Sequence, residues 1–335
     1  MNEGPETQAT VVEEAASATP SLAATARRRK IPEMTALVVF LVAEIIFFWI
    51  KSPVFLTWDN FLNIFTAIAV TGIIAAPGTI LLIAGQFDLS VGSVTAFAGV
   101  VMASISMDHG QPLGVLIAIL AGIGVGLLNG FLVTVVGVNA IITTLGTLAA
   151  FRGLAEVVAS GQSISVEGFN TLGTSRPFFN IPVPVLLLVG VVILLWLVMR
   201  YTVFGRSMYA IGANPAAARL TGVRSKRLLV IAFVLSGLAC ALGGLILVSQ
   251  LGSASPTAAT GLELSVITAI ILGGASLAGG RGTIIGTMVG LMIIGILNNG
   301  LVLLGVDPFW QDVARGALLI AAVSFDQLRI RLGKE

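Results

Sequence analysis

Two long apolar runs enclose the stretch GRSMYAIGANPAAARLTGV, which extends from Gly205 to Val223. The preceding run is PVLLLVGVVILLWLVMR (Pro184 to Arg200), and the following run is LVIAFVLSGLACALGGLILVSQ (Leu229 to Gln250). Crossing the hydrocarbon core of a bilayer takes about 20 predominantly apolar residues in a helix. The enclosed stretch is polar, basic and rich in small residues, so we expect it to be an aqueous loop between two membrane-spanning helices.

The composition of the whole chain supports this interpretation. Hydrophobic residues make up 56% of the chain, charged residues 10%, and the mean hydropathy is +1.03. A soluble protein with this balance could not cover its surface with polar groups. Hydropathy predicts an all-α, polytopic membrane protein of about ten transmembrane helices. The expected spans are residues 34–50, 60–83, 90–106, 113–136, 139–158, 184–200, 229–250, 262–278, 283–304 and 311–325. The region 262–304 is also compatible with re-entrant or broken helices.

The two ends of the chain differ from the rest. Residues 1–32 are rich in Ala, Thr, Glu and Pro and bury too little apolar surface to fold, so we expect a disordered tail. The apolar run from Met34 to Ile50 is followed by Lys51 and Pro53 rather than by a small-residue cleavage site, which indicates an anchor that is retained. We therefore divide the chain into a cytoplasmic tail (1–32), a transmembrane domain (33–328) with a cytoplasmic loop at about 201–228, and a cytoplasmic tail (329–335).

Charge predicts the orientation independently, because short loops rich in Lys and Arg stay cytoplasmic. Basic residues cluster at 27–30, within 200–228 and at 329–334. The middle cluster has no acidic residue and consists of Arg200, Arg206, Arg219, Arg224, Lys226 and Arg227. An even number of expected spans separates each cluster from the next, so all three lie on one side and both termini are cytoplasmic.

Two parts of the chain resemble each other weakly. GLLNGFLVTVVGV (Gly126 to Val138) is similar to GILNNGLVLLGV (Gly295 to Val306), and DLSVGS (Asp88 to Ser93) is similar to SLAGGRG (Ser276 to Gly282). The two similarities lie at different offsets. An internal repeat, which is common in transporters, and chance similarity between Gly-rich and Leu-rich segments both remain open.

Several kinds of chemistry are absent from the sequence. None of the four lysines lies in the phosphate-binding pattern G-x-x-x-x-G-K-[ST]. Cys240 and His109 are the only residues of their types, so disulfides within the chain and thiolate metal clusters are excluded. No G-x-S-x-G motif supports a serine hydrolase. We expect a protein that is not an enzyme, has no ATPase motif of its own, and uses neither a metal nor a cofactor.

The order of residues within the loop predicts a short helix. Asn214 suits an N-cap, and Pro215 suits the first helical position, where its missing N–H costs nothing. Ala216 to Leu220 then form the helix, which Thr221 and Gly222 end. Small side chains would let this helix lie in a groove on another protein. The alternative is a loop that only sets topology, which explains the basic residues but not the Gly-Asn-Pro-Ala-Ala order.

This loop resembles the cytoplasmic coupling segment of permease subunits from ABC importers for monosaccharides, the ribose, xylose and galactose branch. Five further runs resemble the same family in the same order, and the resemblance covers roughly residues 35–328. These runs are DLSVGSV (Asp88 to Val94), VNAIITTLGTLAAFRGL (Val138 to Leu154), PTAATGLEL (Pro256 to Leu264), ILGGASLAGGRGTIIGT (Ile271 to Thr287) and ILNNGLVLLGV (Ile296 to Val306).

The resemblance implies a division of labour between subunits. Two permease subunits, identical or different, would form the pathway in the cytoplasmic (inner) membrane. Separate cytoplasmic ATPase subunits would supply energy, and an extracytoplasmic sugar-binding protein would deliver the substrate; no nucleic acid is involved. The residues implied in coupling to the ATPase are Gly212, Asn214, Pro215, Ala217, Arg219 and Gly222.

Polar residues inside the expected spans are candidates for the sugar path, because such groups usually face a cavity or a partner in a membrane. Amides and hydroxyls suit a neutral polyhydroxyl ligand, since they both donate and accept hydrogen bonds. The candidates are Gln86, Asp88, Asn129, Thr143, Thr144, Gln250, Glu263, Asn298 and Asn299. Structural roles compete with this one: Asn can bridge helices, and Asp88 can cap the span that follows it.

The remaining charged residues look structural. Arg152 and Glu156 have the i,i+4 spacing of an ion pair, Asp312 and Arg315 the i,i+3 spacing, and Glu44 has no partner visible in the sequence. Three alternatives stay open. They are a permease for nucleosides or a furanosyl signalling molecule, a stand-alone ion-coupled carrier or channel that relies on membrane-embedded carboxylates, and a membrane scaffold without transport.

Overall fold

The computed structural model describes residues 33–307, 309–314, 316–318, 320, 321 and 324. The chain divides into a unit of residues 1–32 and a unit of residues 33–335, and all of the described residues belong to the second unit. The two predicted tails, the basic clusters within them and the partner expected for Asp312 lie outside the described residues. The prediction of an all-α protein is confirmed.

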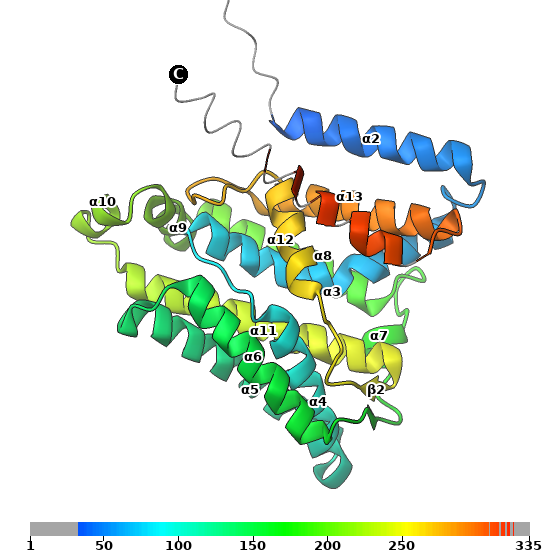
Figure 1. The fold of residues 1–335 in the computed structure, drawn as a ribbon, viewed down its shortest axis with the longest axis horizontal. Helices are drawn as coiled ribbons and strands as arrows, with labels where there is room; N and C mark the ends of the chain where they lie inside the picture. The colour runs from blue at the N-terminus through cyan, green and yellow to red at the C-terminus, as the bar shows by residue number, and fades with distance from the viewer. Residues whose placement is uncertain (1–32, 308, 315, 319, 322–323, 325–335) are drawn as a thin grey trace, which may run out of the picture. The chain divides into compact units, whose positions relative to one another are not determined.

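The secondary structure is almost entirely helical (Figure 1). The only strands in the described part form one short antiparallel pair in which Ile164 lies opposite Ala254. The elements are α2 (Glu33–Lys51), α3 (Trp58–Ile83), α4 (Val91–His109), α5 (Gln111–Phe131), η2 (Leu132–Val136), α6 (Ala140–Ala159), β1 (Ile164–Ser165), α7 (Thr171–Thr174), α8 (Val183–Tyr201), α9 (Val203–Ala213), α10 (Pro215–Leu220), α11 (Ser225–Leu251), β2 (Ser253–Ala254), α12 (Leu262–Leu272) and α13 (Ile284–Leu303).

Most of the expected spans correspond to helices. Among the described residues, seven helices are long and apolar enough to cross a membrane: α3, α4, α5 with η2, α6, α8, α11 and α13. Helix α2 covers the expected first span. The described residues between 309 and 324 are all helical, but the gaps among them prevent a test of the tenth span.

The expected span 262–278 is wrong as a continuous helix, and the alternative of a broken helix is confirmed. Helix α12 has only 11 residues and ends before Gly273. Gly274, Gly279, Gly280 and Gly282 all have positive φ, a backbone conformation that no α-helix contains. The chain therefore runs irregularly from residue 273 to 283 before α13 begins.

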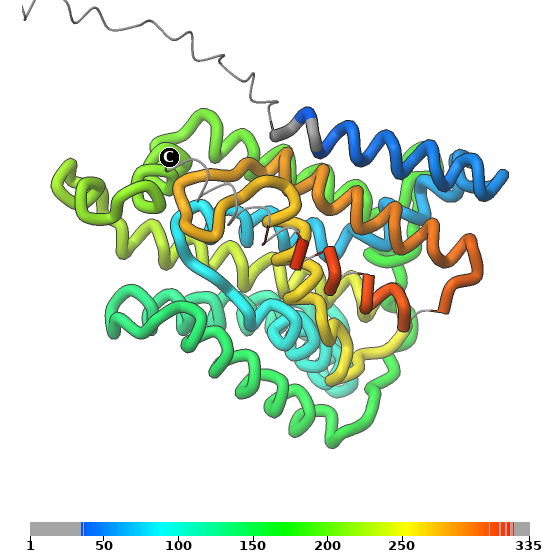
Figure 2. The backbone as a smooth tube through the Cα atoms, turned by 45° about the horizontal axis from the view of Figure 1, so that its top comes forward, coloured from blue at the N-terminus to red at the C-terminus, as the bar shows by residue number. Residues whose placement is uncertain are grey.

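Close backbone contact between helices replaces bulky side-chain packing at the centre of the fold. Gly122 of α5 and Gly237 of α11 face each other so closely that a Cβ on either would overlap the backbone of the other. Small residues at such crossings allow van der Waals contact, which drives helix association in lipid. At the edge of the fold, α2 runs alongside α13 (Figure 2).

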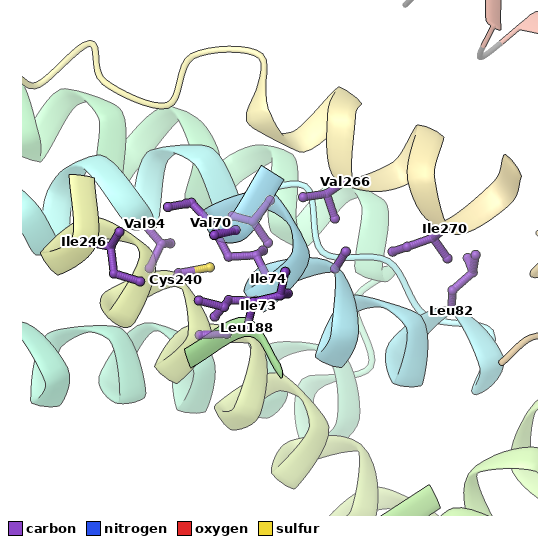
Figure 3. Packing of buried hydrophobic residues seen from close by; sticks show 14 of the residues in the cluster. Val70, Ile73, Ile74, Leu82, Val94, Leu188, Cys240, Ile246, Val266 and Ile270 are labelled. Carbon is purple, nitrogen blue, oxygen red and sulfur yellow. The ribbon is translucent and has the colours of Figure 1, made fainter. Parts of the chain in front are cut away.

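A large apolar cluster joins six helices, α3, α4, α5, α8, α11 and α12, and α5 contributes Val125 (Figure 3). Val70, Ile73 and Ile74 of α3 lie at its centre. Around them lie Val94 from α4, Leu188 from α8, Cys240 and Ile246 from α11, and Val266 and Ile270 from α12. Cys240 is 1% exposed, so the single cysteine is a small packed residue. Helices α3 and α12 are thus held together through aliphatic side chains along much of their length.

Candidate functional site

The predicted loop between α8 and α11 is more structured than the sequence suggested. Two helices, α9 and α10, occupy residues 203–220, so the expectation of a loop with one short helix misses α9. Helix α9 begins where Thr202 accepts a hydrogen bond from the backbone N–H of Gly205 (3.4 Å). Its apolar face, including Met208 and Ile211, is buried against a cluster that also contains Ile80 and Ile83 of α3. Tertiary packing therefore stabilises helix α9, which the local composition does not predict.

The predicted helix α10 is confirmed in detail. Asn214 Oδ1 accepts hydrogen bonds from the backbone N–H groups of Ala216 (3.1 Å) and Ala217 (3.0 Å), and Pro215 is the first helical residue. The helix ends at Leu220, and Gly222 follows with a φ of +83°. This N-cap satisfies two of the otherwise unpaired donors at the start of the helix.

One face of α10 is open and apolar. Ala218 is 4% exposed and attaches the helix to the rest of the fold, whereas Ala216, Ala217 and Arg219 are exposed. Leu220 is 89% exposed, although it is a large apolar residue on a short polar segment. The sequence analysis did not select Leu220 as a site residue. Its place at the end of a helix of small residues is the signal that could have identified it.

Exposed basic side chains occur on α10 and on the segments before and after it. All six basic residues of the 200–228 segment are exposed, and Arg281 in the 273–283 segment is exposed as well. No acidic residue occurs in the 200–228 segment. The surface around α10 is therefore positively charged, with one projecting leucine.

The coupling candidate Gly212 does not belong to the open face. It lies at the end of α9, where an added Cβ would overlap the carbonyl oxygen of Ile83 and come within 2.5 Å of the Gly280 nitrogen. That nitrogen donates a hydrogen bond to the same carbonyl oxygen (2.8 Å). The end of α9, the end of α3 and the 273–283 segment thus meet at one point, which only glycine allows at position 212.

A second contact reinforces this junction. The Tyr209 hydroxyl donates a hydrogen bond to the carbonyl oxygen of Gly282 (2.8 Å). Burial raises the pKa of Tyr209, so the hydroxyl remains a donor at neutral pH. Helix α9 is therefore tied both to α3 and to the segment that connects α12 with α13.

Two irregular segments, residues 84–90 and 255–261, lie at the depth of the membrane. This position is unusual for backbone that is not helical. Residue 88, in the segment 84–90, bonds to Ser236, which is 11 residues or about 16 Å from the start of α11. The segment 255–261 contacts the first turn of α4, because the space beside Gly92 is filled by the Ala259 carbonyl and the Glu263 carboxylate. Non-helical backbone at membrane depth is tolerated only where protein or a water-filled cavity surrounds it. In transporters, such broken helices mark binding sites.

The candidates Asp88 and Asn129 are brought together in one hydrogen-bond network. Asp88 Oδ1 accepts hydrogen bonds from the Ser90 backbone N–H (3.0 Å) and from the Ser90 hydroxyl (2.6 Å). Its Oδ2 accepts from the Ser236 hydroxyl (2.7 Å), and the Asn129 amide donates to Ser90 Oγ (3.0 Å). The network joins the start of α4 to α5 and α11. The structural alternative, that Asp88 caps the next span, is wrong in detail: the N-cap of α4 is Ser90, and Asp88 instead accepts hydrogen bonds from Ser90 and so holds the turn that precedes the helix.

A large cavity lies between α3, α7, α11 and the start of α12. Its volume is about 530 Å³. Of the sequence-predicted candidates, Gln250 lines it. The other lining residues are Asn63, Thr66, Ala67, Val70, Thr71, Gly173, Thr174, Leu247, Ala259 and Leu262. Asn63, Thr66 and Thr71 were missed, although their recurrence at helical spacing on one side of the expected span 60–83 is the signal that could have identified them.

A small cavity of about 20 Å³ lies further along the same two helices. The candidates Gln86 and Asp88 line it, together with Gly78, Leu82, Phe87, Val91, Val266, Ile267 and Ile270. Helix α12 contributes Leu262 to the large cavity and Ile270 to the small one. Val70 lines the large cavity and Val266 the small one, and both belong with Ile74 to the apolar cluster of Figure 3. An apolar seam between α3 and α12 therefore separates the two cavities.

The other candidates line neither cavity. Asn299 exchanges two hydrogen bonds with Asn60 (2.9 and 3.0 Å), which joins α13 to α3. The Thr144 hydroxyl donates to the Ala140 carbonyl (2.8 Å). The remaining three each have a buried side-chain oxygen without a hydrogen bond; these are Thr143 Oγ1, Glu263 Oε2 and Asn298 Oδ1. Glu44 has such an oxygen too, at Oε2.

The predicted ion pair between Arg152 and Glu156 is wrong. Arg152 Nη1 instead donates hydrogen bonds to the carbonyl oxygens of Pro256 (2.7 Å) and Ala258 (3.0 Å). The irregular segment 255–261 leaves these carbonyls without helical partners, and a guanidinium is the donor with the most N–H groups. Arg152 therefore holds this segment in place beside the start of α4.

Comparison with known proteins agrees with the interpretation of the chain as a membrane transport protein. Residues 60–323 match the family described as branched-chain amino acid transport system / permease component. The chain belongs to this family of transport permeases, and the resemblance to sugar importer permeases is thereby confirmed.

Two relatives illustrate the similarity. A ribose import permease from Bacillus subtilis is 40% identical over 283 residues, which cover 83% of this chain and 88% of the relative. An L-arabinose transport system permease from Escherichia coli is 42% identical over 280 residues, which cover 83% of this chain and 85% of the relative. No solved structure matches the chain.

Proposed function

We propose that this protein is the transmembrane permease subunit of an importer that carries a monosaccharide or a similar small polyol across the cytoplasmic membrane. Separate ATPase subunits supply the energy, a second permease subunit completes the pathway, and an extracytoplasmic binding protein delivers the sugar. Relatives that are named for ribose import and arabinose transport support this substrate class. Their similarity extends over more than four fifths of the chain.

The single observation that carries the proposal is the backbone junction of Gly212, Ile83 and Gly280. An ATPase that binds the open face of α10 moves a segment whose other end is packed against α3 and the 273–283 segment. Because glycine leaves no compressible side chain in between, a displacement of α9 is transmitted directly to these elements.

The position of α12 connects this junction to the transport path. The 273–283 segment follows α12 directly, and α12 forms one side of the seam that separates the two cavities. We infer that movement of α9 shifts α12 relative to α3, so that the seam opens and the large cavity becomes continuous with the small one. Alternating access requires two discrete arrangements of this kind, whose populations the ATPase changes.

Orientation follows from the exposed charges. The exposed basic residues of the 200–228 segment and Arg281 support a cytoplasmic position for this end of the molecule, in keeping with the distribution of Lys and Arg in membrane proteins. Both chain termini are then cytoplasmic. In this orientation the large cavity, which α7 lines, faces the outside; α7 and β2 lie far from α10 (Figure 1).

The experiment that tests the proposal introduces bulky charge into the contact with the ATPase, at Ala217→Arg and Gly222→Arg. We expect a permease that folds and inserts normally but no longer links ATP hydrolysis to sugar uptake in proteoliposomes. The control must avoid positions such as residue 258, whose carbonyl oxygen accepts a hydrogen bond from Arg152. The matched control is Gly161→Arg, at an exposed glycine between α6 and β1 that, like Gly222, has a positive φ and would have no neighbouring atom within 4 Å of an added Cβ. Normal coupling in the double variant would refute the proposal.

A further inference from the structure

We infer that Asn63, Thr66 and Thr71 of α3, together with Gln250 of α11, form an outward-facing hydrogen-bonding site for a neutral polyol. This inference rests on the proposed function and names the residues through which the permease distinguishes its substrate. It replaces most of the polar residues that the sequence analysis selected, because only Gln250 of that set lines the large cavity.

The polar residues of α3 form a stripe along the cavity. Asn63, Thr66 and Thr71 all line it, with Ala67 and Val70 between them on the same side. The stripe extends from residue 63 to residue 71, which is about 12 Å along the helix axis. On a membrane-spanning helix, such a polar face is costly against lipid and indicates contact with water, a ligand or another polar surface.

The side chains are available for a ligand. Within the described part of the chain, no hydrogen bond engages the side chains of Asn63, Thr71 or Gln250. The Thr66 hydroxyl donates to the Leu62 carbonyl (2.6 Å), but its oxygen can still accept. Two amides and two hydroxyls offer both donors and acceptors, which matches the hydroxyl groups of a sugar. In contrast, the amide of Asn299 is already paired with Asn60.

The size and charge of the cavity limit the ligand class. A volume of about 530 Å³ is within the usual range of small-molecule sites, about 300–1,000 Å³. None of the lining residues is ionisable. A phosphorylated or acidic sugar would lose hydration here without gaining an opposite charge, and this loss is unfavourable. The aliphatic side chains of Val70, Leu247 and Leu262 can contact the C–H groups of a sugar ring.

The walls of the cavity differ in rigidity. Helix α7 is fixed to the end of α11, because the Gly173 N–H donates to Ser249 Oγ (2.8 Å) and a Cβ at Gly173 would overlap the backbone of Ser249 and Gln250. The opposite wall is the start of α12, which the 273–283 segment connects to the ATPase contact. Gln250 therefore lies on α11, the fixed side of the cavity, whereas Leu262 lies on α12, the side that moves.

The first test asks whether the stripe faces water and sugar. The variants Asn63→Cys and Thr71→Cys are treated from outside with a water-soluble thiol reagent, using the buried Cys240 as an unreactive background. Ile193→Cys, on an exposed position of the spanning helix α8, is the lipid-facing control. We expect both stripe positions to react at least about tenfold faster than the control, and D-ribose or L-arabinose, but not ribose 5-phosphate, to slow the reaction. Reaction as slow as that of the control would overturn the inference, and so would equal protection by the phosphate.

The second test separates this inference from the proposed function. In the triple variant Asn63→Leu, Thr71→Val and Gln250→Leu, we expect normal assembly with the ATPase but uptake reduced by more than about tenfold, because three hydrogen bonds to the substrate are lost. Thr147→Val, on α6 and away from both cavities, is the matched control. Unchanged uptake by the triple variant would overturn this site while the importer function stands. Failure of the wild-type chain to associate with any ATPase would instead overturn the function.

Discussion

Gly212 of α9 lies directly against the carbonyl oxygen of Ile83, the last residue of α3, and no side chain larger than hydrogen fits between them. The same oxygen accepts a hydrogen bond from Gly280. One backbone oxygen therefore joins the segment proposed to contact the ATPase, a helix that lines both cavities, and the segment that follows α12. This geometry makes the junction a direct physical link between the proposed ATPase contact and the proposed transport path.

The junction predicts a strong effect of the smallest possible substitution. In Gly212→Ala, the added methyl group must displace the backbone of α3 or of the 273–283 segment. We expect the variant to bind the ATPase but to lose about tenfold or more in coupled sugar uptake, since a misplacement of about 1 Å can cost two orders of magnitude. Uptake and ATP hydrolysis would be measured together in proteoliposomes. Gly146→Ala, at a glycine of α6 with open space around it, should be neutral; equal effects of the two variants would contradict the role of the junction.

Leu220 is predicted to be an anchor for the ATPase. An apolar side chain that is 89% exposed on a basic surface gains stability only when a partner covers it. We expect Leu220→Ala to weaken association with the ATPase by about 1.4–2.8 kcal/mol, or roughly ten- to a hundredfold in Kd. Surface plasmon resonance on nanodiscs would measure this change. Phe179→Ala removes an even more exposed side chain, at 91%, from the opposite end of the molecule. Phe179→Ala should leave the affinity for the ATPase unchanged. If Phe179→Ala weakens this affinity and Leu220→Ala does not, the ATPase binds the opposite end and the proposed orientation is reversed.

Arg152 and Glu156 are predicted to behave differently, although their spacing suggests a pair. Arg152→Met removes both hydrogen bonds to the 255–261 segment and leaves two carbonyl oxygens without donors, so we expect a loss of about 2–4 kcal/mol in the free energy of unfolding. Glu156→Gln should change stability by less than about 0.5 kcal/mol. Thermal unfolding in detergent would compare the two. Similar destabilisation by both variants would restore the ion pair that the sequence suggested.

The network around Asp88 gives a prediction for stability rather than transport. Ser236→Ala leaves Asp88 Oδ2 without its 2.7 Å hydrogen bond, which should destabilise the protein by about 1–3 kcal/mol. Ser106→Ala is the control, because that hydroxyl donates only to the Met102 carbonyl of its own helix (2.7 Å). The midpoint of thermal unfolding should fall clearly for the first variant and hardly at all for the second. A fall of equal size in both would mean that Asp88 is satisfied by other groups.

Local signals explain which parts of the fold could be predicted. The capping by Asn214 and the ending at Gly222 depend on residues adjacent in sequence, so the boundaries of α10 were correct. Helix α9 depends on burial of Met208 and Ile211 against residues more than a hundred positions earlier, and no local pattern reports such packing. The early end of α12 was hidden for a different reason. Residues 273–283 are as rich in small residues as the helices around them, and only the backbone angles show that their glycines break the helix.

The candidate path residues show the same limit. The sequence identifies polar residues within spans, but it does not show whether their hydrogen bonds are satisfied. The amide nitrogens of Asn129 and Asn299 donate hydrogen bonds to Ser90 and Asn60, respectively, whereas no hydrogen bond engages the side chains of Asn63 and Thr71. The useful signal was therefore the helical spacing of the polar residues on α3, rather than their occurrence in similar segments of the two halves.

The most direct test of the central claim is sugar uptake into proteoliposomes that contain the permease and the binding protein, with and without the ATPase, and with ATP at the α10 side of the membrane. We predict that uptake requires both the ATPase and ATP, because α10 is the point where the energy enters. Uptake that continues undiminished after the ATPase is left out would contradict the account.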